Sequence, residues 1–191
     1  MSTPHDSEEL SYSASGCFRV RLSRDACDDP WGMSIETSRS GGVSVASVRM
    51  FGAEPVPEYN RGVAEERRVQ VHDEVVSVNG LTAPEEIAAA FRSDRSLVLL
   101  MHRPRMFSLT LDKGGKALGG IEVSYQKTGS SLHVDDVRSA KLQNANAETL
   151  RAGDCITAID GRRGSGPELI KLFQASDMPE LTIARRQASR L

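Results

Sequence analysis

The stretch VQVHDEVVSVNGLT, residues 69–82, alternates apolar and polar side chains, passes through an acidic turn and closes with Asn-Gly. Four of its valines have the period of a half-buried β-strand: Val69, Val71, Val76 and Val78. The pair Asn79-Gly80 tolerates the positive φ angles that a tight turn needs. Taken alone, the stretch predicts a strand followed by a turn.

The same pattern occurs a second time, in LRAGDCITAIDGRR at residues 150–163. Asp154 stands 81 residues after Asp73, and the pair Asp160-Gly161 has the same offset from Asn79-Gly80. In both copies a segment with helical period follows, PEEIAAAFR or GPELIKLFQ, and then an apolar strand, SLVLLMHR or ELTIARR. A period near 80 residues is too long for a solenoid repeat, so the sequence predicts two tandem copies of one small domain.

The composition is that of a globular protein, since the 191 residues are 39% hydrophobic and 26% charged. Two domains fit this length, and each would bury about 60% of its unfolded surface, as small domains do. The net charge is −2, and acidic and basic residues are interspersed. This charge pattern gives no basic face of the kind that nucleic acid requires.

The sequence also argues against a membrane protein and against an enzyme. No apolar run approaches the ~20 residues of a membrane span, and the first residues lack the apolar core of a secretory signal. We expect an intracellular protein with reduced thiols, because Cys17, Cys27 and Cys155 are odd in number and lack metal-ligand spacing. The histidines form no catalytic or metal-binding pattern, and GGKALGG lacks the ending of a phosphate loop. We expect no catalytic residue, no metal and no cofactor.

The chain divides into five parts. These are a disordered N-terminal tail at 1–16, a first domain at 17–103, a linker at 104–105, a second domain at 106–186 and a C-terminal tail at 187–191. A linker this short spans at most roughly 10 Å, so the two domains should lie in contact. Each domain should contain a short helix before its motif: one after the prolines of FGAEPVPEYNRGVAEERR and one in NANAETLR.

The order of elements in each copy resembles that of a PDZ domain: strand, glycine-containing loop, two strands, short helix, Leu-x-x-Gly-Asp, strand, longer helix, strand. LRAGDCITAIDG matches the family's signature closely, and VQVHDEVVSVNG matches it except that His72 stands where glycine is usual. The resemblance covers about 165 of the 191 residues. It implies an α+β fold of two small, partly open β-barrels or sandwiches, each capped by a short and a longer helix.

The resemblance further implies a non-enzymatic scaffold that binds C-terminal or extended peptides by β-strand addition. The loop before the second strand would bind the peptide carboxylate through backbone N–H groups, helped by a nearby cation. PWGM at 30–33 and LGGI at 118–121 stand in the places of the family's Gly-Leu-Gly-Phe loop, and both depart from it at the first glycine. Pro30 also removes one N–H donor.

The predicted groove residues form one set in each domain. In domain 1 they are Arg24 as the cation, Trp31, Gly32, Met33, Ser34, Ile35, Pro84, Ala88 and Phe91. In domain 2 they are Lys113 or Lys116 as the cation, Leu118, Gly119, Gly120, Ile121, Val123, Gly166, Ile170 and Phe173. The helix faces place an apolar pocket at the carboxylate end, so partners should end in an apolar residue. PDZ domains that select Ser or Thr two residues before the peptide's end carry His at the helix start, where this chain has Pro84 and Gly166.

Three alternatives remain open. The pair could regulate a protease carried on another chain, as PDZ domains do in the high-temperature-requirement family, or it could be an assembly protein with closed grooves, as in Golgi stacking proteins. The ending Ser189-Arg190-Leu191 is close to the Ser-Lys-Leu peroxisomal address, so a peroxisomal import receptor is a further candidate partner and a peroxisome-type organelle a candidate location.

Overall fold

The computed structural model describes residues 16–138, 141–143 and 148–186, with the backbone alone described at 141–143. The predicted tails therefore lie outside the described residues, apart from Gly16. Domain 1 contains β1 (Cys17–Ser23), β2 (Met33–Thr37), β3 (Val43–Val48), α1 (Pro55–Gly62), a 3₁₀ turn (Glu65–Arg67), β4 (Glu74–Val78), α2 (Pro84–Ser93) and β5 (Ser96–His102). Domain 2 contains β6 (Arg105–Asp112), β7 (Ile121–Ser124), β8 (Leu132–Val137), β9 (Lys141–Gln143), β10 (Cys155–Ile159), α3 (Gly166–Ala175) and β11 (Glu180–Arg185).

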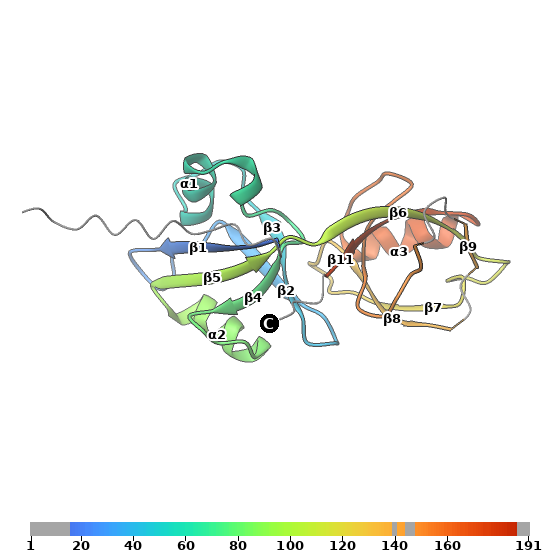
Figure 1. Ribbon diagram of the computed structural model, residues 1–191, viewed down its shortest axis with the longest axis horizontal. Helices are drawn as coiled ribbons and strands as arrows, with labels where there is room; N and C mark the ends of the chain where they lie inside the picture. The colour runs from blue at the N-terminus through green and yellow to red at the C-terminus, as the bar shows by residue number, and fades with distance from the viewer. Residues whose placement is uncertain (1–15, 139–140, 144–147, 187–191) are drawn as a thin grey trace, which may run out of the picture.

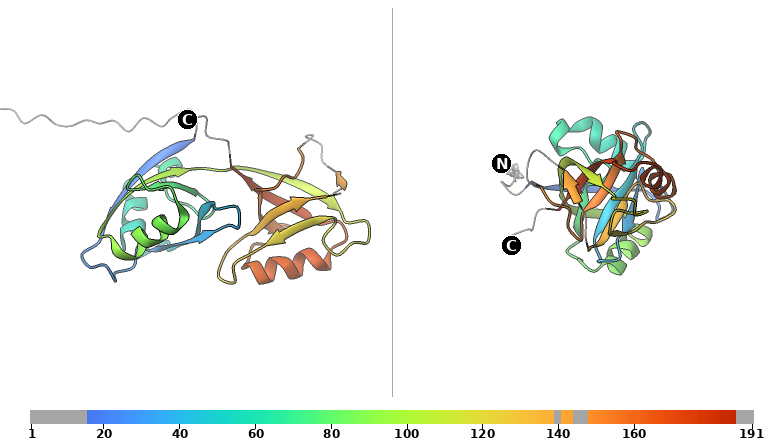
Figure 2. Two further views of the ribbon diagram at one scale, coloured as in Figure 1. Left: turned by 90° about the horizontal axis from the view of Figure 1, so that it is seen from below. Right: turned by 90° about the vertical axis from the view of Figure 1, so that its right-hand side faces the viewer.

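Each domain is built on one antiparallel sheet that does not close into a barrel (Figure 1). The strand order is β1-β5-β4-β3-β2 in domain 1 and β7-β8-β10-β11-β6-β9 in domain 2. In Figure 2 the helices α2 and α3 lie beside the strands of their own domains. The second half of the chain thus repeats the architecture of the first, as the 81-residue period predicts.

The helices begin where their prolines and caps allow. Pro55 and Pro84 stand at the first turns of α1 and α2, where the missing N–H has no intrahelical partner to lose. The expectation that the short helix follows the prolines of residues 51–68 was wrong, because α1 starts at them. Helix α3 begins with a capping box between Ser165 and Glu168. The first half of the short helix expected in NANAETLR, residues 144–147, lies outside the described residues, and the other half, residues 148–151, is not helical.

The first motif forms a shorter strand than its valine alternation predicts. The strand β4 starts at Glu74, because the chain turns at His72, whose φ is 75°. Its pairing with β5 shifts register between Val75 and Ser77. This irregularity changes which side faces inward, so Val75 and Val78 are buried while Val76 is only half-buried.

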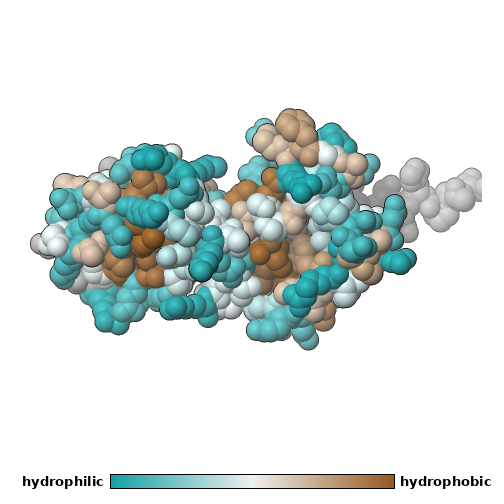
Figure 3. All heavy atoms as spheres, turned by 180° about the vertical axis from the view of Figure 1, so that it is seen from behind, coloured by the Kyte–Doolittle hydropathy of each residue, from teal (hydrophilic) through white to brown (hydrophobic). Residues whose placement is uncertain are grey.

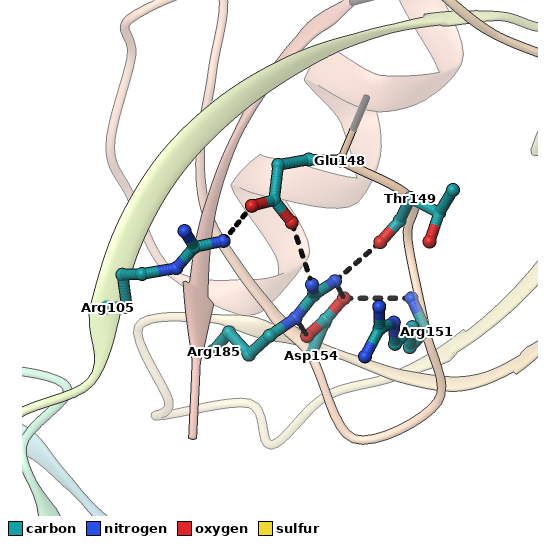
Figure 4. Close-up of polar contacts among 6 residues, drawn as sticks. All are labelled: Arg105, Glu148, Thr149, Arg151, Asp154 and Arg185. Atoms are coloured by element: carbon teal, nitrogen blue, oxygen red, sulfur yellow. Dashed lines mark hydrogen bonds and ion pairs between the residues drawn. The ribbon is translucent and has the colours of Figure 1, made fainter. Parts of the chain in front are cut away.

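The aspartate of the repeated motif, Asp154 in LRAGD and Asp73 in VQVHD, is structural. Asp154 is buried and accepts hydrogen bonds from Arg185 Nε and Nη2, both at 2.7 Å, and from the N–H of Arg151 at 2.8 Å (Figure 4). Arg185 also donates to the carbonyl of Thr149 at 2.5 Å and pairs with Glu148 at 3.1 Å. The motif thereby ties the segment before β10 to the last strand, β11.

Domain 1 contains the same arrangement. Asp73 accepts hydrogen bonds from Arg103 at 2.7 and 3.2 Å and from the N–H of Gln70 at 2.7 Å. Arg103 also donates to the carbonyl of Arg68 at 2.5 Å. Burial raises the pKa of Asp73, although Arg103 and the backbone N–H act in the opposite direction. The repeat is therefore conserved between the two halves in its polar contacts as well as in its strands.

The two domains contact each other, as the short linker requires. Only Arg103 and Pro104 separate β5 from β6, and Arg105, placed in the linker by the sequence analysis, belongs to β6. Glu36 of β2 is 2% exposed, and its Oε1 accepts a hydrogen bond at 2.8 Å from Ser131 of domain 2. Arg186 pairs with Glu74 at 3.3 Å across the same contact. The side of β2 that carries Glu36 is therefore covered by the second domain.

Candidate functional site

The strands β2 and β7 lie at the edges of their sheets, next to α2 and α3 (Figures 1 and 2). Two backbone hydrogen bonds flank β2 on the side of β3. The carbonyl of Gly32 accepts from the N–H of Arg49, and the N–H of Ser38 donates to the carbonyl of Gly42. Antiparallel ladders alternate, so the N–H and C=O groups of Met33, Ile35 and Thr37 point away from β3. This outward row is a template for an added strand.

The loop before β2 leaves backbone donors free at the end of this row. The N–H groups of Trp31, Gly32 and Met33 donate to no described carbonyl of the loop, and Met33 faces β3 in a non-hydrogen-bonded pair. Gly32 has a φ of 79°, and a Cβ there would meet Pro57 Cδ at 2.5 Å. Only glycine fits this position, and it lets the loop turn tightly enough to direct successive N–H groups toward an anion.

The corresponding loop of domain 2 is closed by its own backbone. The N–H of Gly119 donates to the carbonyl of Lys116 at 3.2 Å, and the N–H of Ile121 donates to Leu118 at 3.1 Å. Gly119 and Gly120 both have positive φ, so the loop has the geometry of two consecutive turns. Of the three predicted donors, only Gly120 is left without a bond of this kind in the described residues. A carboxylate would have to displace the turns.

Two of the three cations predicted for the carboxylate, Arg24 and Lys113, bind carbonyl groups at helix ends. Arg24 donates to the carbonyls of Phe91, Arg92 and Asp94 at the end of α2, at 2.8–3.2 Å. Lys113 is 4% exposed and donates to Phe173 and Gln174 at the end of α3, at 3.0 and 3.1 Å. The last carbonyls of a helix lack intrahelical donors and carry partial negative charge, so they bind these cations instead. The other candidate, Lys116, is exposed.

The residues expected to line the pocket of domain 1 come from β2 and α2. Met33 and Ile35 are half-buried against the core of domain 1, beside the buried ring of Phe91 and the half-buried Ala88. Trp31 is 5% exposed, packs edge-on against Phe91 and donates its Nε1–H to the carbonyl of Phe91 at 2.8 Å. Its side chain is therefore part of the core, so the contribution that Trp31 could make to the site comes from its backbone N–H.

Domain 2 repeats this arrangement, but two of its expected pocket residues are more deeply buried. Leu118, Val123 and Ile170 are half-buried against the core, whereas Ile121 and Phe173 are 3% and 0% exposed. Because Phe173 has no exposed surface, removing its side chain would test the stability of the domain rather than peptide binding.

In both domains, contacts occupy the end of the expected groove that lies far from the carboxylate loop. In domain 1 the outward carbonyl of Thr37 accepts a hydrogen bond at 2.7 Å from Gln126 of domain 2. In domain 2 the N–H of Gly166 donates to Gly129 at 3.0 Å, and a Cβ on Gly166 would meet the Tyr125 side chain at 2.7 Å. Pro84 and Gly166 stand at the helix starts as predicted, and neither offers a side-chain donor. These contacts favour a short bound segment.

Sequence reasoning missed the buried polar contact behind β2. His133 Nε2 lies 3.9 Å from Glu36 Oε1, and neither His133 Nε2 nor Glu36 Oε2 has a hydrogen-bond partner in the described part of the chain. Burial lowers the pKa of His133, while Glu36 acts in the opposite direction. The only signal in the sequence is a glutamate within a strand that alternates toward the core, and that pattern does not reveal which surface covers it.

Comparisons with known proteins add weak similarities. No family of known proteins and no curated protein matches the chain. Among solved structures it is similar to INAD PDZ45 in complex with NG2 peptide, with 16% identity, a TM-score of 0.38 and coverage of 92% of each chain. It is also similar to INAD PDZ45 in the complex with NORPA CC-PBM, with 17% identity, a TM-score of 0.37 and coverage of 91% of this chain and 93% of that one.

Because these identities and TM-scores are low, the fold of each domain is assigned from the chain's own topology. An edge strand beside the longer helix, a glycine loop at its start and a short helix after the third strand occur together in domain 1. Both domains have a PDZ-like fold. Domain 2 shows the same strand order around its edge strand and long helix, with β9 added beyond β6.

Three other predictions are not tested by the described residues. The Ser-Arg-Leu ending lies outside them, so peroxisomal import stays a prediction. Within them, no group of three or more His, Cys, Asp or Glu side chains could hold a metal ion. Among the same residues, no helix has the length and apolar character that a membrane crossing needs.

The cysteines give a first testable prediction. Burial raises the pKa of the Cys155 thiol to about 12, whereas Cys27 is exposed. Because the thiolate is the reactive form, we expect iodoacetamide at about pH 8 to alkylate Cys27 at least a hundredfold faster than Cys155. Mass spectrometry of timed samples measures both rates, and denatured protein provides the control in which they converge. Similar rates in the folded protein would contradict the burial of Cys155.

Proposed function

We propose that this chain is a non-enzymatic, tandem PDZ-like binding module that captures protein C-termini by strand addition at β2 of domain 1. One observation carries the proposal: free N–H donors at Trp31, Gly32 and Met33 adjoin an edge strand whose ladder groups point outward. A peptide carboxylate would accept from these donors, and the residues before it would pair with β2. Domain 2 is the weaker site, because Gly119 and Ile121 already donate within their own loop.

The groove of domain 1 favours a short peptide with an apolar last residue. Met33, Ile35 and Phe91 provide the apolar contact for that residue, and burying it contributes about 1.5–3 kcal/mol. Pro84 offers no hydrogen bond to a Ser or Thr two residues before the end, so that position should be loosely selected. Since Gln126 occupies the carbonyl of Thr37, pairing extends over the last three or so residues. Affinities in the micromolar range follow from so small a contact.

Replacing Ile35 with proline tests strand addition directly. The N–H of Ile35 points away from β3, so proline removes a donor that the folded protein does not use. We expect Ile35→Pro to weaken binding of a selected free-acid peptide at least about tenfold, because a ladder bond is lost and the ring obstructs the incoming strand. Fluorescence anisotropy with labelled C-terminal peptides from a random library measures the change, and thermal unfolding shows that the domain remains folded.

Matched variants separate the competing explanations. Ile35→Ala removes the side chain but keeps the N–H, and should weaken binding by only a few-fold. Val123→Pro makes the equivalent change in β7, where the N–H of Val123 also points away from the neighbouring strand, and should leave most of the binding intact. The C-terminal amides of the same peptides should bind poorly. Amides that bind as well as acids, or an Ile35→Pro protein that binds normally, would refute carboxylate capture at β2.

A second candidate function applies to domain 2 alone. Its closed loop and the contact of Tyr125 with Gly166 favour a structural role, in which the domain holds β2 of domain 1 through Gln126 and Ser131. A Gln126→Ala variant tests this role, because it frees the carbonyl of Thr37 for pairing with a bound peptide. In this variant a longer part of the peptide should be protected from amide hydrogen exchange, and the number of binding sites should not change. Two binding events per chain in calorimetry would instead show that domain 2 binds peptide itself.

A further inference from the structure

A cavity of about 720 Å³ lies outside both grooves, and no step of peptide capture uses it. Its walls come from the end of β3 and the loop after it, from α1, from residues 68–73 before β4, from the start of domain 2, and from Arg163 in the loop between β10 and α3. In Figure 3, which shows one face of the molecule, apolar side chains gather in separate patches on a mostly hydrophilic surface, some of them beside the junction of the domains. A cavity of this size is large enough to hold several side chains of a bound peptide.

Positive charge dominates the cavity wall. Five arginines line it: Arg49, Arg61, Arg68, Arg103 and Arg163. The acidic residues of the wall are Glu65 and the buried Asp73, whose carboxylate is taken by Arg103. Arg49 is paired with Glu54. Arg68 and Arg163 are exposed, and in the described ranges neither forms an ion pair with an acidic side chain. The wall therefore favours an anionic occupant.

Apolar side chains lie beside the arginines, so a polypeptide segment matches the cavity better than an inorganic anion does. Met50 and Phe51 are 80% and 83% exposed, and Met106 at the start of β6 is 44% exposed. All three line the cavity. Exposed large apolar side chains around a charged hollow are typical of a surface that binds another polypeptide segment. The occupant should thus carry carboxylates and apolar side chains together.

The chain contains such a segment next to the cavity. Residues 1–15, MSTPHDSEELSYSAS, carry three carboxylates and the apolar side chains of Leu10 and Tyr12. The described chain starts at Gly16, whose carbonyl accepts a hydrogen bond at 3.2 Å from the N–H of Arg103, a residue of the cavity wall. Six residues lie between Glu9 and Gly16, and the seven Cα–Cα steps that join them span at most roughly 25 Å. The acidic residues are therefore within reach of the arginines.

We propose that the acidic N-terminal segment, residues 1–15, binds this cavity within its own chain. Glu8 and Glu9 pair with Arg68 and Arg163, and Leu10 contacts the apolar wall formed by Met50 and Phe51. The tether at Gly16 raises the effective concentration of the segment to roughly millimolar, so a weak site suffices for occupancy. The interaction weakens as salt is added, because exposed charges carry much of it.

The test compares arginine modification in full-length proteins. Phenylglyoxal modifies accessible guanidinium groups, and peptide mass spectrometry assigns the rate to each arginine. We expect the Glu8→Lys/Glu9→Lys variant to react about threefold or more faster than the wild type at Arg68 and Arg163. The matched control is Glu85→Lys/Glu86→Lys, an adjacent, exposed glutamate pair at the start of α2 that does not line the cavity. The control should react like the wild type.

The outcomes separate the proposal from its competitors. Equal rates at Arg68 and Arg163 in all three proteins would overturn it, and so would protection that appears only as the protein concentration rises, since that shows a segment from another copy. A second variant, Arg68→Glu/Arg163→Glu, tests the receiving side and should increase hydrogen exchange of the segment's amides about threefold or more. Unchanged exchange in that variant would likewise refute binding at this wall.

Discussion

Replacing Asp154 with alanine is expected to lower the free energy of unfolding of domain 2 by about 3–5 kcal/mol. Asp154 is 2% exposed and is the acceptor for both Arg185 nitrogens and for the N–H of Arg151. Its removal leaves the largely buried guanidinium of Arg185 without its bidentate partner and leaves a buried donor unpaired. Urea unfolding followed by far-UV circular dichroism measures the loss.

The neighbouring carboxylate provides the control for this prediction. Glu148 also pairs with Arg185, and with Arg105, but it lies at the surface of the cluster. Its replacement by alanine should therefore cause a much smaller loss than that of Asp154. Asp73→Ala should reproduce the large effect in domain 1, because Arg103 and Gln70 surround Asp73 in the same way. An Asp154→Ala protein within about 1 kcal/mol of the wild type would show that the cluster is not structural.

The sequence predicts the duplicated fold because its strongest signals are local. Turn pairs such as Asp160-Gly161, the aspartate of each motif, and the switch from strand to helix period all depend on near neighbours in the chain. Register irregularities are different. The shift between Val75 and Ser77 depends on the partner strand β5, so the valine alternation includes the half-buried Val76 and omits the buried Val75, although Val78 is buried.

The candidate site could be predicted in position but not in detail. The edge strands and the helix face follow from the PDZ-like order of elements, and Ala88 and Phe91 lie where the helical period places them. The bonds of Arg24 and Lys113 could not be predicted, because the acceptors are carbonyls about 60 residues or more away. The contact of Gln126 with Thr37 depends on how the two domains meet, which no local pattern encodes.

His72 gives the second large prediction, a loss of stability on acidification. Its φ is 75°, and its N–H donates to Val45 as that of Gly153 donates to Val134 in the second copy. Burial, with help from Arg163 and His133, lowers the pKa of His72 to about 4 from its usual 6.5. The folded protein therefore resists protonation of this ring, while the unfolded chain does not.

The sign of the effect follows from proton linkage. Above pH 6.5 the ring is neutral in both states and contributes no pH dependence. Between pH 6.5 and 4 the unfolded state binds the proton and the folded state does not, so stability falls. The loss amounts to about 2 kcal/mol at pH 5 and about 3 kcal/mol at pH 4. Burial also lowers the pKa of His133, which adds to the loss, whereas the raised pKa of Asp73 opposes it.

The His72→Gly variant isolates the contribution of this ring, because the second copy shows that glycine suits the turn. Near pH 7.5 the free energy of unfolding of the variant should be within about 1 kcal/mol of the wild type. The relief of strain at the left-handed φ stabilises the variant, and the added freedom of its unfolded chain has the opposite effect. Between pH 7.5 and pH 5 the free energy of unfolding of the variant should fall by about 2 kcal/mol less than that of the wild type. Comparing the two proteins cancels the contributions of His133 and Asp73. If urea titrations give equal losses for both between these pH values, the ring is not the group that resists the proton.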